Sequence, residues 1–161
     1  MKNNVEAVNP NAQIIEGISE VITEQGGKIK GKKVLVIEDG PTVTHGSMAY
    51  GAGTVGANQY HPKEIVDPRP FATGSIIDTF DKYTHLEKVL PAMGYGKKQM
   101  KELEQTINNA DVDLIVSGTP IDLSRVLHTD TPLIRVRYGV GDNTAKELEG
   151  IIDSFIKTHL K

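Results

Sequence analysis

Three short segments, each stiffened by glycine or proline, carry the side chains of this sequence that could do chemistry. Residues 38–46 contain two carboxylates and a histidine, residues 67–75 hold Arg69 between two prolines, and residues 118–123 contain a threonine and an aspartate. A guanidinium can bind a phosphate through two hydrogen bonds, and an imidazole can transfer a proton near neutral pH. Carboxylates are oxygen ligands that suit Mg²⁺. Together, these residue types predict a site for an anionic, phosphorylated metabolite.

The catalytic groups that we expect in these segments are His45, Arg69 and Asp39. Threonine hydroxyls and the backbone N–H groups of glycine-containing turns would bind the ligand. The expected ligand-binding residues are Gly40, Thr42, Thr44, Gly46, Gly51, Gly53, Thr73, Gly118, Thr119 and Asp122. Glu38 and Asp39 are the candidate Mg²⁺ ligands, acting through water molecules.

Each segment also has a purely structural interpretation. The stretch from Thr119 to Asp122 fits the start of a helix, with the threonine as N-cap and the proline at the first helical position. Arg69 could brace Asp39 or Asp67 instead of a ligand, and a loop histidine such as His45 is usually a surface residue. The sequence leaves both interpretations open.

Short apolar runs rich in β-branched residues predict strands that are buried on both faces. The expected strands are 33–37, 64–67 and 113–117, with an alternating edge strand at 133–138 and a weaker strand at 12–16. The expected helices are 48–59, 75–90, 97–109 and 144–160. Because strands and helices alternate, the sequence predicts an α/β fold, a three-layer Rossmann-like parallel sheet with helices on both faces.

The three polar segments each follow one of the predicted strands directly. The carboxyl ends of parallel strands meet at one edge of the sheet, which is where doubly wound folds bind their ligands. We therefore expect the three segments to converge on one site.

Length, charge and composition exclude several classes of protein. A chain of 161 residues suits one domain with a short appendage. The 18 Lys and Arg residues against 21 Asp and Glu residues give a formal net charge of −3, which argues against nucleic-acid binding. The absence of cysteine excludes disulfides and thiolate nucleophiles, and the five histidines form no metal-binding motif. With no signal peptide or membrane span in view, we expect a cytoplasmic protein that does not bind membranes.

The stretch Gly51–Gly56 matches the G-x-G-x-x-G pattern of dinucleotide-binding folds, and Asp67 lies where an acid is expected. However, a long loop separates the first glycine from its strand, so close packing of a helix on the sheet is the favoured role, with the helix N-terminus open to an anion. The sequence contains no G-x-x-x-x-G-K-[ST] phosphate-binding loop and no G-x-S-x-G nucleophile elbow.

Several blocks of this sequence, in the same order, resemble the cyclic 2,3-diphosphoglycerate synthetase family, whose wider membership is often described as predicted GTPases. The blocks are residues 34–46, 50–53, 65–76, 89–96 and 118–123, within a similarity that runs from about Val5 to Tyr138. Members of that family are much longer, and this chain resembles only their carboxyl-terminal third. The resemblance therefore implies that residues 1–30 correspond to the end of an NTPase core and that residues 31–161 form a Rossmann-like α/β domain.

In the synthetase of that family, ATP and Mg²⁺ drive closure of a phosphoanhydride in 2,3-diphosphoglycerate. The resemblance thus implies an ATP-dependent cyclising ligase or an NTPase, with ATP or GTP handled only together with a P-loop partner domain or subunit. Alone, a chain without the phosphate-binding loop should be inactive. The alternatives are a non-catalytic interaction or homo-oligomerisation domain of a predicted GTPase and, less favoured, a dinucleotide-binding module.

Overall fold

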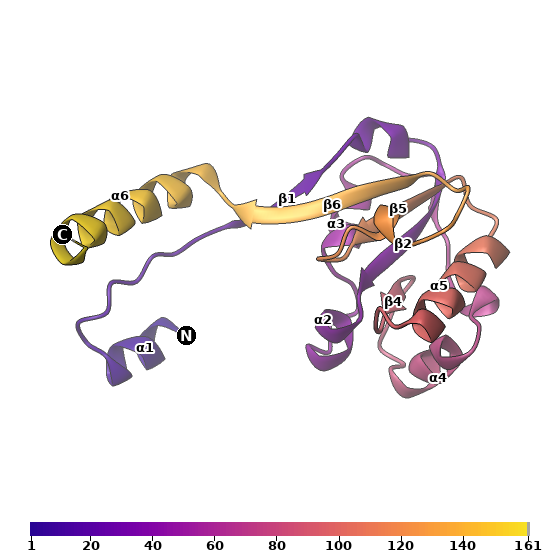
Figure 1. Ribbon diagram of the computed structural model, residues 1–161, viewed down its shortest axis with the longest axis horizontal. Helices are drawn as coiled ribbons and strands as arrows, with labels where there is room; N and C mark the ends of the chain where they lie inside the picture. Colours follow the sequence, from indigo (N-terminus) through magenta and orange to yellow (C-terminus); the bar gives the residue numbers. More distant parts are fainter. Residues whose placement is uncertain (161) are drawn as a thin grey trace. The chain divides into compact units, whose positions relative to one another are not determined.

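A computed structural model describes residues 1–160 of the chain, which form two compact units. The larger unit is Val21–Tyr138, and the smaller combines Met1–Glu20 with the chain from Gly139 onward. The ribbon is shown in Figure 1. The division between the units falls inside two strands, β1 (Ser19–Thr23) and β6 (Leu133–Val140).

The sheet has six strands in the order β1–β6–β5–β2–β3, and β4 also pairs with β2. The remaining strands are β2 (Lys33–Asp39), β3 (Glu64–Ile65), β4 (Leu90–Ala92) and β5 (Leu114–Gly118). All pairings among β2 to β6 are parallel. β3 pairs with the beginning of β2, at Lys33 and Val34, and β4 pairs with its end, from Ile37 to Asp39, so two short strands share one edge of β2.

The larger unit contains four α-helices and three short 3₁₀ turns. They are α2 (Gly40–His45), α3 (Ala52–Asn58), α4 (Ser75–Lys82), α5 (Lys97–Asn109), η1 (Gly26–Ile29), η2 (Arg69–Phe71) and η3 (Leu123–Arg125). α3 packs on β2 and β5, while α4 packs on α5, which buries Leu103 and Ile107 in the core (Figure 1). The predicted fold class is confirmed, because a mostly parallel sheet is flanked by helices.

The centre of the core is the apolar run in β2. Val34, Leu35, Val36 and Ile37 are all fully buried, so this strand is covered on both faces, as its unbroken apolar pattern predicts. Side chains alternate between the faces of a strand, which places Val36 and Glu38 on the same face. That face carries α3, because a Cβ built on Gly53 of α3 would lie 3.1 Å from a methyl group of Val36.

The structure corrects the predicted elements in several places. Residues 12–16 form no strand, and β6 is not an edge strand because β1 pairs with its outer side. The helix expected over 75–90 ends at Lys82, after which the chain forms β4 with a proline at its centre. Thr119 does not start a helix, since Asp122 caps the short turn η3 instead. α2 lies in a segment that was expected to be a loop.

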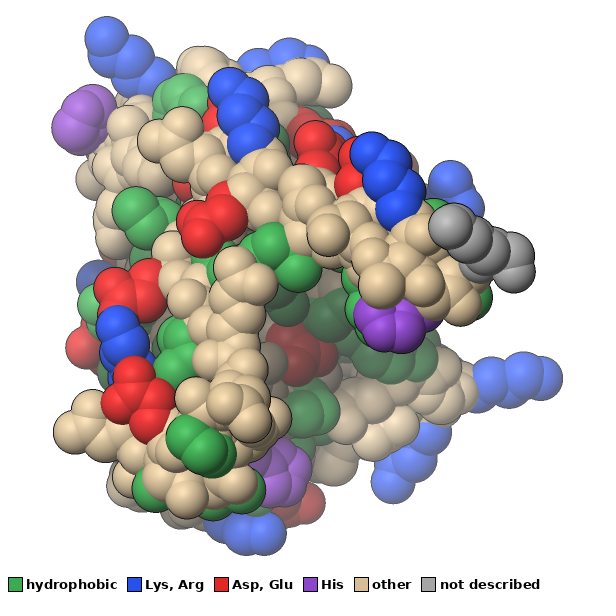
Figure 2. Space-filling model, turned by 90° about the vertical axis from the view of Figure 1, so that its left-hand side faces the viewer, with side chains coloured by type: hydrophobic (Ala, Val, Ile, Leu, Met, Phe, Trp, Pro, Cys, Tyr) green, Lys and Arg blue, Asp and Glu red, His purple; other side chains and the backbone are tan. Residues whose placement is uncertain are grey.

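The smaller unit contains the helices α1 (Lys2–Val8) and α6 (Asp142–His159), and neither of them has a buried residue. α6 is amphipathic, because Leu148, Ile152, Phe155 and Ile156 recur at helical spacing and all four are exposed. Exposed hydrophobic side chains are visible among charged ones in Figure 2. Within residues 1–160, no helix has the length and apolar character needed to cross a bilayer.

Two glycines in helices provide a test of the packing of α3. We expect Gly56→Ala to lower the free energy of unfolding by about 1–3 kcal/mol, the usual cost of overpacking. Its new Cβ would lie 2.6 Å from Thr23 Oγ1 and 2.9 Å from a methyl group of Val136. Gly150→Ala in α6 is the matched control, because its Cβ meets nothing within 4 Å and alanine favours a helix by up to about 1 kcal/mol. Urea unfolding followed by circular dichroism measures both variants, and equal effects would contradict the described packing.

Candidate functional site at the carboxyl edge of the sheet

The carboxyl ends of β4, β2 and β5 lie side by side. Asp39 is in register with Ala92 on one side of β2, and Glu38 with Gly118 on the other. From β2 the chain passes first to β3 and β4 on one side and then to β5 on the opposite side. Such a reversal of direction is the place where doubly wound folds bind ligands. The segments after β2 and β5 therefore converge here, as predicted.

The third polar segment does not leave from the same edge, because the strand before it, β3, ends beside the beginning of β2. β3 ends opposite Val34, and the backbone N–H of Val66 donates to the Val34 carbonyl. Arg69 then forms an ion pair with Asp67, with 2.6 Å between Nη2 and Oδ2 and further hydrogen bonds from Nε. The guanidinium holds the pKa of Asp67 below its usual value. In this structure Arg69 thus braces a neighbouring aspartate, one of the two roles that the sequence left open.

Glu38 is the central residue of the edge. Its carboxylate is 1% exposed and accepts hydrogen bonds from the backbone N–H groups of Gly51 (3.0 Å), Gly53 (3.0 Å) and Thr54 (2.8 Å), and from Thr54 Oγ1 (3.0 Å). These donors form the N-terminus of α3, which the macrodipole makes favourable for a negative charge. Burial raises the pKa of Glu38, and the hydrogen bonds oppose that rise.

Glycine is required around Glu38 because there is no space for a side chain. A Cβ on Gly118 would lie 2.5 Å from both Glu38 Oε2 and the backbone nitrogen of Gly53, and a Cβ on Gly51 would lie 2.7 Å from Glu38 Oε2. The glycines of the G-x-G-x-x-G match therefore allow α3 to approach β2 and β5 closely. The helix N-terminus that was expected to be open to an anion holds the chain's own carboxylate.

Asp39 plays a similar part for α2, the helix that directly follows β2. Its Oδ2 accepts hydrogen bonds from the backbone N–H of Thr42 (3.2 Å) and from Thr42 Oγ1 (2.7 Å), so it caps the N-terminus of α2. Thr44 Oγ1 donates to the Gly40 carbonyl, and His45 Nδ1 lies 3.2 Å from the Pro41 carbonyl. The ring of His45, at the end of α2, is exposed. The backbone N–H of Gly46 donates to the Thr42 carbonyl.

The candidate Mg²⁺ ligands do not form a metal site by themselves. Both Glu38 oxygens accept hydrogen bonds inside the protein, and Asp39 is used as a helix cap. Within residues 1–160, no cluster of three or more His, Asp or Glu side chains is arranged to hold a metal ion. These two side chains therefore do not fit the role of a resident Mg²⁺ centre.

Thr73 and Thr119 stabilise loops in the structure. Thr73 Oγ1 donates to the Glu102 carbonyl of α5 at 3.0 Å, which anchors the segment after η2. Thr119 Oγ1 is buried, where it donates to the Ile121 carbonyl and lies 2.9 Å from Ser117 Oγ. Both hydroxyls are thus engaged by hydrogen bonds within the chain.

Tyr95 is a residue of this edge that sequence reasoning missed. Burial, followed by the negative charge of Asp39, raises the pKa of the Tyr95 hydroxyl. The residue is 38% exposed, and the raised pKa keeps its hydroxyl protonated. The sequence signal that could have identified it is the pair of glycines, Gly94 and Gly96, that surround it directly after β4.

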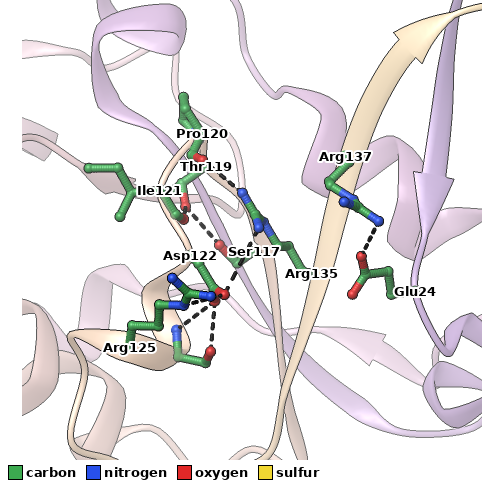
Figure 3. A network of polar contacts seen from close by, with 10 residues as sticks. Glu24, Ser117, Thr119, Pro120, Ile121, Asp122, Arg125, Arg135 and Arg137 are labelled. Atoms are coloured by element: carbon green, nitrogen blue, oxygen red, sulfur yellow. Dashed lines mark hydrogen bonds and ion pairs between the residues drawn. The ribbon is translucent and has the colours of Figure 1, made fainter.

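A second group of charged residues lies beside the end of β5. Figure 3 shows Arg135 between Asp122 and the ion pair of Arg137 with Glu24. Asp122 accepts hydrogen bonds from the backbone N–H and hydroxyl of Ser124 and lies 3.4 Å from Arg125 Nε. Sequence reasoning included Asp122 but missed both arginines of β6, although their i, i+2 spacing places them on one face of a strand.

Comparison with curated proteins finds 50% identity over 157 residues to the arginine synthetase ArcE of Thermococcus kodakarensis. The similarity covers 98% of this chain and 35% of that protein, so the chain spans about a third of the length of the relative that it matches. No family model matches the sequence, and no solved structure matches it. The chain is therefore homologous to one part of a longer synthetase.

The buried Glu38 carboxylate predicts a specific pH dependence of stability. Since its folded pKa lies above its ordinary value of 4.5, its stabilising contribution is fully present below that value and is lost as pH rises through the raised pKa. We expect the wild type to lose stability relative to Glu38→Gln as pH rises, because the variant carries no ionisable group there.

Urea unfolding of both proteins between about pH 4 and pH 8 measures this difference. Other carboxylates whose pKa is lowered act in the opposite direction, but they are present in both proteins and cancel; they are Asp67, Glu102, Glu104 and Asp122. Glu87→Gln, at an exposed position, is the control. A constant difference between the wild type and Glu38→Gln over the whole range would show that Glu38 has the same pKa in the folded and unfolded states.

Proposed function

We propose that this chain is a substrate-binding, Rossmann-like domain of a larger ATP-dependent synthetase with ligase-type chemistry. The observation that carries the proposal is the 50% identity to an arginine synthetase over 98% of the chain. The fold agrees with it, because an α/β sheet with its direction reversal between β2 and β5 is suited to small-molecule binding. The sequence contains no phosphate-binding loop, and we therefore propose that the nucleotide binds to another part of the protein or to a P-loop partner subunit.

The substrate that we propose for the carboxyl edge is an anionic, phosphorylated metabolite or intermediate, as in a cyclic 2,3-diphosphoglycerate synthetase-like reaction. Both helix N-termini at this edge are capped by Glu38 and Asp39. Recognition would therefore depend on side chains, with His45 and Tyr95 as hydrogen-bond donors and Arg69 as the cation. Arg69 can exchange Asp67 for a ligand at low cost, because the guanidinium is 48% exposed and such surface ion pairs contribute at most about 1 kcal/mol.

Mg²⁺ would enter with the nucleotide in this proposal. Within residues 1–160 no carboxylates form a metal site, so the ion would be held by the phosphates of ATP or GTP and by the P-loop partner. The related synthetase is named for arginine as its product. We propose arginine as the second ligand class of the complete protein, as the product of the synthesis and the substrate of its reverse.

A second candidate function is that of an interaction or oligomerisation domain, and the observation that favours it is the exposed apolar stripe of α6. The two functions are compatible within one larger assembly. The dinucleotide-binding alternative is weaker, because the glycines Gly51 and Gly53 donate to Glu38.

Thermal unfolding of the chain with a ligand panel tests the proposed function. The panel contains 2,3-bisphosphoglycerate, arginine, ATP, GTP and NAD, each with and without Mg²⁺. A ligand at 100 times its dissociation constant adds about 2.7 kcal/mol and raises the midpoint by a few degrees. We expect a shift with 2,3-bisphosphoglycerate or arginine, and none with ATP, GTP or NAD alone.

Arg69→Ala should weaken binding of 2,3-bisphosphoglycerate about tenfold or more, because it removes a charge-assisted hydrogen bond. Lys98→Ala is the control, since it removes one cation from the exposed face of α5. A shift with ATP by the chain alone would contradict the assignment of the nucleotide to another part. No shift with either substrate class would overturn the substrate-binding function and favour the interaction domain.

A further inference from the structure

A polar cleft of about 250 Å³ lies beside β6, within the larger unit. It is lined by Glu24, Gln25, Asp122, Ser124, Leu133, Ile134 and Arg135. The register places Arg135 opposite Ser117, near the carboxyl end of β5, so the cleft lies next to the direction reversal of the sheet. Ligand sites usually measure about 300–1,000 Å³, so the cleft suits a very small ligand and not a nucleotide.

Arg135 is the best-anchored cation of this cleft. Its side chain is 27% exposed, and Nη2 donates to the Pro120 carbonyl at 2.8 Å. Its nearest carboxylate is Asp122, at 4.0 Å from Nη1, the outer limit for an ion pair. Among residues 1–160, Nε of Arg135 is buried and has no hydrogen-bond partner. Leaving a buried N–H donor unsatisfied is unfavourable, and an acceptor on a ligand satisfies it once the guanidinium turns toward the cleft.

The strongest charged partners of the two carboxylates of the cleft are exposed arginines, and Asp122 also accepts hydrogen bonds from Ser124. Glu24 pairs with Arg137 at 2.5 Å, and Asp122 lies 3.4 Å from Arg125. The Arg137 and Arg125 side chains are 55% and 82% exposed. Because exposed ion pairs contribute little to stability, a cation on a ligand can replace either arginine at little cost.

We infer that this cleft binds a free α-amino acid with a cationic side chain, its carboxylate on Arg135 and its cationic groups on Glu24 and Asp122. The inference rests on the proposed function, because it names an amino-acid substrate of the same synthetase. The charge pattern selects a zwitterion, because the guanidinium can donate hydrogen bonds to the anionic end and the two carboxylates can accept them from the cationic end. A phosphate dianion would be repelled by the same two carboxylates.

Isothermal titration of the chain with L-arginine tests the inference, and agmatine, which has the same guanidinium but no carboxylate, is the matched ligand. We expect L-arginine to bind at least tenfold more tightly than agmatine. Arg135→Lys keeps the positive charge but loses the planar guanidinium, which can bind a carboxylate through two hydrogen bonds. The variant should weaken L-arginine binding at least tenfold while leaving agmatine binding unchanged. Asp122→Asn should weaken the binding of both ligands. Lys98→Ala should change neither.

NMR of the arginine Nε–H groups gives a direct readout. We expect one Nε–H resonance, absent from Arg135→Lys and therefore assigned to Arg135, to shift on addition of L-arginine and not of agmatine. Equal affinity for the two ligands, or full L-arginine binding by Arg135→Lys, would overturn the inference. If 2,3-bisphosphoglycerate binds and L-arginine does not, the amino-acid cleft is wrong and the proposed function stands. If neither binds, both are wrong.

Discussion

The hydrogen bonds to Glu38 are the interaction on which the arrangement of the larger unit depends. A buried carboxylate is costly unless its charge is compensated, and here three backbone N–H groups and one hydroxyl supply the compensation. Those donors belong to the loop before α3 and to α3 itself, while the acceptor belongs to β2. Gly118 of β5 completes the contact by leaving space for the carboxylate. One side chain thus joins the central strand, its covering helix and the neighbouring strand.

This arrangement changes where a ligand can be recognised. In many doubly wound folds the helix N-terminus at the direction reversal of the sheet binds the ligand's phosphate. In this chain the corresponding N–H groups of α3 are bound to Glu38, and those of α2 are capped by Asp39. In the function that we propose, recognition is therefore left to side chains at the rim, such as Tyr95, and to the polar cleft that contains Arg135. The lack of a phosphate-binding loop in the sequence is consistent with this division of roles.

Sequence reasoning was most successful where local pattern and burial agree. The unbroken apolar run of β2 and the helical spacing of α5 depend on the residues themselves, and α5 begins and ends where its pattern predicts. β4 could not be predicted, because a three-residue strand with a central proline forms only by pairing with the end of β2. The outer position of β1 beside β6 is likewise a property of the whole sheet. The partners of Glu38 and Arg135 are 13 or more residues away in sequence, so only the folded chain shows them.

The same contact that fixes α3 also isolates the segment before it. The segment starts at Asp39, directly after Glu38, and ends at Gly51, whose N–H binds the Glu38 carboxylate. Both ends of the segment are therefore held at one point of the sheet, whatever lies between them. During divergence of a gene family, the exposed positions of this segment can change without moving α3 or β5, whereas Val43 and Thr44 are buried. The exposed stretch that begins at His45 is thus a practical position at which to introduce new sequence.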